Sequence, residues 1–255
     1  MIFLIKVGDY VTRNSYHNDM VFKVINIDSD IVYLKGVEYR LYATASINDL
    51  VITKSIKDDF NPSLIVDDER SEYFYLPGKI LHLDSDREYL KRCMNYYKSN
   101  NLYAIGKCID EEELVNNINS LLNEYKVDIL VITGHDYLKK NTNKFDIDNY
   151  QNSKNFYNAI KEARKYEKSH DKLIIIAGAC QSDYEDLIMA GANFASSPKR
   201  INIHALDPAI IASNLSMTRK NKEVDLKELL NKTKNGSDGI GGLICSGVMY
   251  VGYPR

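Results

Sequence analysis

From residue 79 to residue 216 the chain alternates short apolar runs with longer amphipathic segments, and this alternation restricts the fold more than any other feature. The apolar runs are KILHLD at 79–84, LYAIGKC at 102–108, DILVITG at 128–134, KLIIIAGA at 172–179 and RINIHAL at 200–206. The segments between them carry apolar residues at helical spacing, most clearly in DEEELVNNINSLLNEY at 110–125. Apolar strands that alternate with helices are typical of a mostly parallel sheet covered by helices on both faces.

The first 54 residues follow a different pattern. Stretches such as VFKVINI at 21–27 and DIVYLKG at 30–36 alternate apolar and polar residues, and turn residues separate them. This pattern predicts a small β-barrel-like domain of the SH3 kind over 1–54. Residues 55–75 hold many acids, one proline and no clear period, which predicts a linker. An α/β domain then occupies 76–255, and GIGGLICSGVMYVGYPR at its end predicts an edge hairpin or strand pair.

Composition excludes several classes of protein. The formal net charge is -2, so no basic field favours nucleic acid. No apolar run approaches the roughly 20 residues that a membrane helix needs, and MIFLIKVGDY reads as a first strand and not as a signal peptide. The four cysteines show no C-x-x-C pair, which favours free thiols in a reducing compartment and argues against a zinc site. We therefore expect no metal, no cofactor and no membrane or nucleic-acid partner.

Two reactive side chains follow neighbouring apolar runs in the predicted sheet. His135 comes directly after the third run, and Cys180 comes directly after the fourth. In sheets of this kind, functional groups gather at the carboxyl ends of the strands. An imidazole beside a thiol can take its proton or stabilise the thiolate, which is the nucleophilic form. The sequence therefore predicts Cys180 as a nucleophile and His135 as its partner.

Other residues allow different readings. Cys93, Cys108 and Cys245 are predicted to be small core residues, because a cysteine in a buried element is more often packed than reactive. His204 is the rival base: the stretch around Cys180 resembles a nucleophile elbow, and with His204 it would suit an amidotransferase-like hydrolase. A non-catalytic alternative is a flavodoxin-like binding module, although no glycine-rich phosphate loop follows the first apolar run.

The order of the two residues resembles that of caspase-like peptidases. His135 stands 45 residues before Cys180, and that family places its histidine about 50 residues before its cysteine. The resemblance implies a caspase-like sheet, here preceded by the small SH3-like β domain. Caspases carry glycine after the histidine, whereas Gly134 precedes His135 here and Asp136 follows it. Asp136 would then donate the backbone N–H that forms the oxyanion hole together with that of Cys180.

Longer motifs resemble the YabG family of sporulation peptidases. They are GDYVTRNSY at 8–16, LPGKILHLDSDREYLKRC at 76–93, DILVITGHD at 128–136, AGACQS at 177–182 and GANFASSPKRINIHALDP at 191–208. The resemblance covers most of the chain and implies a thiol peptidase made in the mother-cell cytoplasm of a spore-former, which becomes spore-associated. It also implies protein substrates of the spore coat and cortex, and a preference for arginine at the cleaved bond.

An arginine preference requires an acid in the S1 pocket, since a carboxylate is the best partner for a guanidinium. In arginine-cleaving relatives of caspases this acid can follow the first strand, where this chain has Asp84 and Asp86. Asp84 is the first choice, because Asp86 could instead cap the following helix. Asp207 follows the fifth apolar run and is the third candidate.

The predicted linker also contains an arginine. Arg70 lies in DDERSEY at 67–73, between two predicted compact units. Exposed linkers are preferred sites of proteolysis. An arginine-specific peptidase would therefore have a cleavage site at Arg70 in its own chain, unless Arg70 only pairs with the neighbouring acids.

Overall fold

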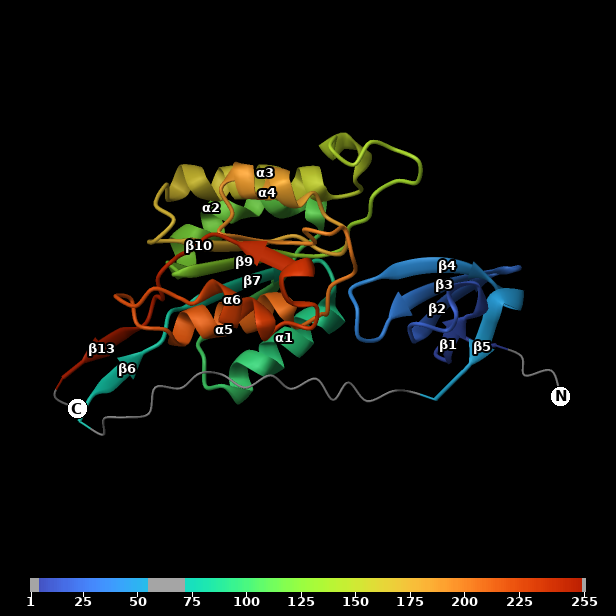
Figure 1. Ribbon diagram of the computed structural model, residues 1–255, viewed down its shortest axis with the longest axis horizontal. Coiled ribbons are helices and arrows are strands. Elements are labelled where there is room, and N and C mark those ends of the chain that lie inside the picture. Colours follow the sequence, from blue (N-terminus) through green and yellow to red (C-terminus); the bar gives the residue numbers. More distant parts are fainter. Residues whose placement is uncertain (1–4, 55–71, 254–255) are drawn as a thin grey trace. The chain divides into compact units, whose positions relative to one another are not determined.

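We describe the protein from a computed structural model, which defines residues 5–54 and 72–253 (Figure 1). The chain divides into two compact units, Met1–Asn61 and Pro62–Arg255. Arg70 and most of the predicted linker lie outside the described residues. The last residues assigned to that linker, 74 and 75, belong to a strand of the second unit, β6 (Phe74–Leu76).

The N-terminal unit is a five-stranded antiparallel sheet with the order β4-β3-β2-β1-β5. Its strands are β1 (Tyr10–Arg13), β2 (Phe22–Asp28), β3 (Ile31–Gly36), β4 (Tyr42–Ser46) and β5 (Leu50–Ile52). Alternate residues of these strands, such as Phe22 and Val24 on β2 or Val32 and Leu34 on β3, fill the core. Because the last strand pairs with the first, the sheet has the strand order of an SH3-like barrel, as predicted from the alternating sequence.

The main sheet of the second unit has the order β12-β11-β10-β9-β7-β8. Its strands are β7 (Ile80–Asp84), β8 (Ala104–Cys108), β9 (Ile129–Thr133), β10 (Ile174–Ala177), β11 (Phe194–Ser196) and β12 (Ile240–Gly242). All pairs are parallel except β11 with β12, which is antiparallel. The prediction of a mostly parallel sheet is confirmed.

Helices cover both faces of this sheet (Figure 1). One face carries α2 (Leu114–Tyr125), α3 (Ser153–Tyr166) and α4 (Tyr184–Ala190), and the other carries α1 (Arg87–Ser99), α5 (Asp207–Met217) and α6 (Leu226–Asn231). Short 3-10 turns occur at Asn14–Tyr16, Ile47–Asp49, Glu111–Glu113, Ile147–Asn149 and Gly236–Asp238. Within the described parts of the chain, no helix combines the length and apolarity needed to cross a bilayer.

Two predicted strands differ from the structure. The apolar run at 200–206 is not a strand; the fifth parallel strand is β11, formed by the preceding Phe194–Ser196. Ser197 and Arg200 have left-handed φ values of 63° and 55°, so the chain turns away from the sheet before the apolar run begins. At the C-terminal end, β12 and β13 (Tyr250–Gly252) do not pair with each other: β12 joins the edge of the main sheet, and β13 pairs with β6.

Candidate active site

The topology of the main sheet selects one edge for function. The chain leaves β7 toward β8 on one side and returns to β9 on the other side, so β7 and β9 flank a switch point at which ligands bind in α/β sheets. Next to β9 lies β10, where Ala177 pairs with Ile132. His135 and Cys180 are each three residues beyond these paired positions. They therefore follow adjacent parallel strands, which run about 4.8 Å apart, at the same level of the sheet.

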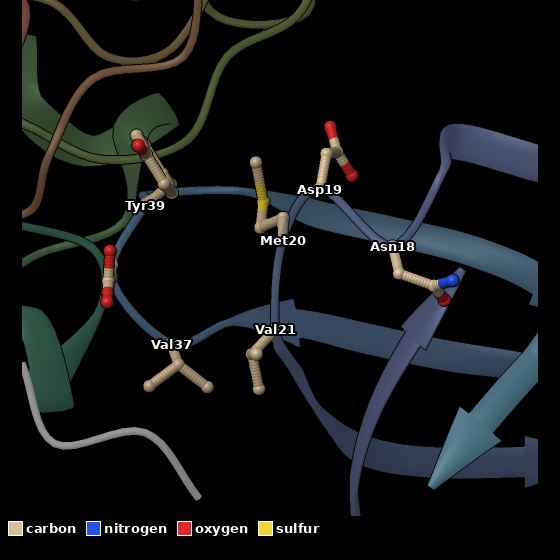
Figure 2. Close-up of a pocket in the computed structure, with 7 residues that line it drawn as sticks. Asn18, Asp19, Met20, Val21, Val37 and Tyr39 are labelled. Atoms are coloured by element: carbon tan, nitrogen blue, oxygen red, sulfur yellow. The ribbon is translucent and has the colours of Figure 1, made fainter. Parts of the chain in front are cut away.

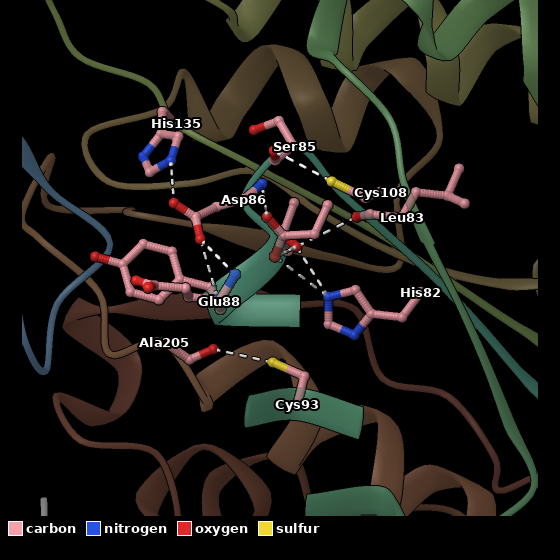
Figure 3. A network of polar contacts seen from close by, with 12 residues as sticks. His82, Leu83, Ser85, Asp86, Glu88, Cys93, Cys108, His135 and Ala205 are labelled. Atoms are coloured by element: carbon pink, nitrogen blue, oxygen red, sulfur yellow. Dashed lines mark hydrogen bonds and ion pairs between the residues drawn. The ribbon is translucent and has the colours of Figure 1, made fainter. Parts of the chain in front are cut away.

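His135 is held through its ring and its backbone. Its Nε2 lies 3.3 Å from Oδ2 of Asp86, which follows β7 (Figure 3). Its backbone N–H donates to Glu111 Oε1 at 2.7 Å, and its carbonyl accepts from Asn152 Nδ2 at 2.9 Å. Gly134 permits this arrangement, because a side chain there would collide with the Glu111 carboxylate. The imidazole therefore has a defined position at the strand end.

Asp86 has two roles at this edge. Its Oδ1 accepts the N–H groups of Glu88 and Tyr89 at 2.8 and 3.1 Å, so the interpretation of Asp86 as the N-cap of α1 is confirmed. Its other oxygen faces His135. The cap fixes the carboxylate, so Asp86 presents a rigid negative charge to the imidazole.

Asp84, the first candidate for the S1 acid, has no exposed surface. Its Oδ1 accepts the backbone N–H of Asp86 at 2.9 Å, and its Oδ2 accepts from Thr133 Oγ1 at 2.8 Å. These bonds join β7 to β9 directly below the turn that carries Asp86. Asp84 thus supports the position of Asp86.

Cys180 also has no exposed surface. The backbone N–H of Ile203 donates to its Sγ at 3.3 Å. The adjacent N–H of Gln181 donates to the carbonyl of Ile201 and to Ser197 Oγ, at 3.1 and 3.0 Å. We call residues 197–204 the covering segment, because they lie across the loop that carries the thiol.

The Asp136 carboxylate connects the loops of His135 and Cys180. Its Oδ1 accepts the N–H groups of Tyr137 and Asn152 at 2.9 and 2.7 Å. Its Oδ2 accepts from Ser153 Oγ at 2.5 Å and from Ser182 Oγ at 2.9 Å, two residues beyond Cys180. Burial raises the pKa of this carboxyl despite the four hydrogen bonds. The sequence indicated only a backbone role for Asp136, and no local pattern pointed to this bridge.

His204 lies in a buried turn before α5, and Asp207 is the first residue of that helix. The Nδ1 of His204 accepts the backbone N–H of Leu206 at 3.1 Å, which places the proton of the neutral ring on Nε2. Asp207 accepts the N–H groups of His204 and Lys234 at 3.0 and 2.9 Å. Neither side chain has exposed surface. Asp207 therefore stabilises the turn that follows the covering segment.

The other cysteines differ in their surroundings. Cys93 is buried, and its thiol donates to the carbonyl of Ala205 at 3.3 Å. Cys245 is buried, and burial raises the pKa of its thiol to about 11. The prediction that Cys108 is a core residue is wrong: it ends the edge strand β8 and is exposed, with its Sγ 3.5 Å from the carbonyl of Ser85.

The N-terminal unit has a hollow of its own, of about 130 Å³ (Figure 2). The residues that line it are Asn18, Asp19, Met20, Val21, Val37, Glu38 and Tyr39. Among these described residues there is no cysteine or histidine, so the chemistry of a thiol and an imidazole belongs to the second unit.

Comparison with known proteins gives two matches. The family model of YabG peptidase U57 matches residues 6–62 and 61–254, which include both units. The Sporulation-specific protease YabG of Bacillus subtilis (strain 168) is 39% identical over 285 aligned positions, which cover 98% of each chain. The similarity therefore extends over the β unit as well as the α/β unit.

Proposed function

The chain belongs to the YabG family of peptidases and is a peptidase of sporulation, and we propose that it cleaves peptide bonds with Cys180 as nucleophile and His135 as catalytic partner. The observation that carries this proposal is their equal offset beyond the paired residues Ile132 and Ala177. The bridge from Asp136 to Ser182 supports it further, because it ties the two loops together. Membership in a peptidase family favours this function over an amidotransferase-like enzyme or a binding module.

The chemistry follows from the position of the imidazole. Asp86 Oδ2 accepts a hydrogen bond from the Nε2–H of His135, which leaves Nδ1 to exchange a proton with the Cys180 thiol. The thiolate attacks the carbonyl carbon of the scissile bond, and the backbone N–H groups of Cys180 and Asp136 stabilise the oxyanion. The imidazolium then protonates the leaving amine. Water, deprotonated by His135, releases the acyl group from the sulfur and restores the thiol.

Asp86 acts in this proposal as a positioning residue, and Asp86→Asn tests the role cleanly. Asparagine is as good an N-cap as aspartate, so α1 should keep its stability while the charge beside His135 is lost. We expect kcat to fall at least about tenfold, because no carboxylate then fixes the tautomer of His135 or stabilises its imidazolium form. Asp86→Ser, a second capping residue, should behave alike; an unchanged kcat in Asp86→Asn would remove Asp86 from the mechanism.

We propose further that the enzyme prefers arginine before the cleaved bond and processes proteins of the spore coat and cortex. It would be made in the mother-cell cytoplasm and become associated with the spore. Asp84, Asp86 and Asp207 stay candidates for the acid that binds arginine, but each would have to exchange internal hydrogen bonds for the guanidinium. The identity of this acid therefore needs a separate argument.

Cleavage of matched peptides tests the thiol mechanism and the specificity together. We expect the purified full chain to cut a peptide after arginine and to cut its lysine and glutamine analogues much more slowly, as followed by mass spectrometry. Treatment with iodoacetamide should abolish cleavage in proportion to the alkylation of Cys180, measured by peptide mapping. Full activity with alkylated Cys180 would end the thiol mechanism, whereas equal cleavage after lysine would end only the arginine preference.

A further inference from the structure

Arg200, in the covering segment, occupies a guanidinium site close to Cys180. Its Nη2 donates to Asp183 Oδ1 at 3.0 Å and to Glu185 Oε2 at 2.5 Å. Its Nε donates to Tyr150 Oη at 2.6 Å, and the guanidinium lies 5.5 Å from the centre of that ring. Only 13% of the Arg200 side chain is exposed. Two carboxylates and a tyrosine therefore surround the cation.

The same segment covers the nucleophile. Asp183 and Glu185 are three and five residues beyond Cys180: Asp183 caps α4, the helix that follows the loop of the thiol, and Glu185 lies in its first turn. Arg200 binds that pair, and three residues later the N–H of Ile203 donates to the thiol sulfur. The covering segment thus covers Cys180 with its backbone, and its Arg200 side chain occupies the site that Asp183 and Glu185 form.

We propose that Asp183 and Glu185 bind the arginine side chain of the substrate, and that Arg200 occupies their site in the resting protein. When a substrate arginine replaces Arg200, the covering segment leaves Cys180, so occupation of the site exposes the nucleophile. This inference rests on the proposed function, because it supplies the acid that an arginine-specific thiol peptidase requires.

The energetics favour exchange of one arginine for another. The Asp183 side chain is only 3% exposed, and burial raises its pKa to about 6 although Arg200 acts in the opposite direction. If Arg200 left without a replacement, this carboxylate would stay buried without its cation, which is strongly unfavourable. A substrate guanidinium restores the ion pair and the bond to Tyr150 Oη. Lysine provides a compact point charge and cannot reproduce the planar fork of donors.

The covering segment also contains two residues with a rarely adopted backbone conformation. It lies outside the sheet, and its Ser197 and Arg200 are non-glycine residues with positive φ, a region that L-residues rarely adopt. Ser197 and Arg200 are therefore in a disfavoured backbone conformation, and displacement of the covering segment would relieve this strain.

The rate of Cys180 alkylation by iodoacetamide, read by peptide mapping of the full chain, tests the covering role without any substrate. Arg200→Ala should raise this rate at least tenfold, whereas Lys199→Ala, which removes an exposed cation of the same segment, should not change it. N-acetyl-arginine amide should accelerate alkylation of the wild type, and N-acetyl-lysine amide should not. If Arg200→Ala does not fold, Glu185→Gln and Tyr150→Phe loosen the same clamp and should raise the rate in the same direction.

Ligand binding tests the acid pair directly. Benzamidine should raise the Tm of Arg200→Ala by several degrees and should leave the Tm of Arg200→Ala/Glu185→Gln unchanged. The inference would be overturned if Cys180 of Arg200→Ala were alkylated at the wild-type rate, or if benzamidine did not raise the Tm of this variant. Neither result would contradict the thiol mechanism, which depends on cleavage by Cys180 in the wild type. Conversely, faster alkylation and benzamidine binding in a protein that cleaves independently of Cys180 would support the guanidinium site and reject the thiol mechanism.

Discussion

Cys180→Ala should abolish peptide cleavage, with kcat at least about 10³-fold below that of the wild type, because no other group can form the acyl intermediate. The substitution also removes the sulfur that accepts the Ile203 N–H, so we expect a Tm lower by a few degrees in a protein that still folds. Cys180→Ser keeps an acceptor for that N–H and should be equally inactive with a Tm closer to the wild type. Cleavage assays and circular dichroism on both variants separate chemistry from folding.

The remaining cysteines are the controls for this result. Cys108→Ala should retain full activity and stability, since its thiol is exposed at the sheet edge. Cys93→Ala and Cys245→Ala remove buried thiols and should reduce stability modestly while kcat stays unchanged. Loss of activity in one of these variants, together with near-normal turnover by Cys180→Ala, would transfer the nucleophile to another position.

His135→Ala should lower kcat by about 10²–10⁴-fold, because the thiol loses the group that takes its proton and the leaving amine loses its acid. His135 is partly exposed and lies on a loop, so the Tm should change little. Saturating-substrate kinetics will show the loss in kcat and not in KM. The rate of Cys180 alkylation near neutral pH should fall as well, since thiol reactivity follows the thiolate fraction.

His204→Ala is the matched control for the histidine. It removes a buried ring whose Nδ1 accepts the Leu206 N–H, so we expect a clear loss of stability. Any reduction of its kcat at a temperature where it is folded should be small. The reverse result, with His204→Ala inactive and His135→Ala active, would favour the nucleophile-elbow arrangement over the proposed one.

The sequence predicted most of the sheet because β7, β9 and β10 are short, apolar and separated by clear helical patterns. It misplaced the fifth strand because Phe194–Ser196 is only three residues long, whereas Ile203 and Ala205 of the run at 200–206 are buried in a loop. Periodicity records which residues are buried, and it does not distinguish a strand from a buried turn.

The site was predictable only as far as strand ends are predictable. His135 and Cys180 were found because each follows an apolar run. The contacts from Asp86 to His135, from Asp136 to Ser182 and from Arg200 to Asp183 join residues 49, 46 and 17 positions apart. No local pattern encodes such pairs, since they depend on the order of strands in the sheet.

The pairing of β6 with β13 has a consequence for any cut in the chain before residue 72. β6 (Phe74–Leu76) lies near the start of the described part of the second unit, and β13 (Tyr250–Gly252) lies near its end. Three antiparallel residue pairs join the two strands. Cleavage after Arg70 would leave β6 in the same fragment as the α/β unit. The α/β unit would keep β6 paired with β13 after such a cut. We therefore expect the cut to separate the two compact units without unfolding either one.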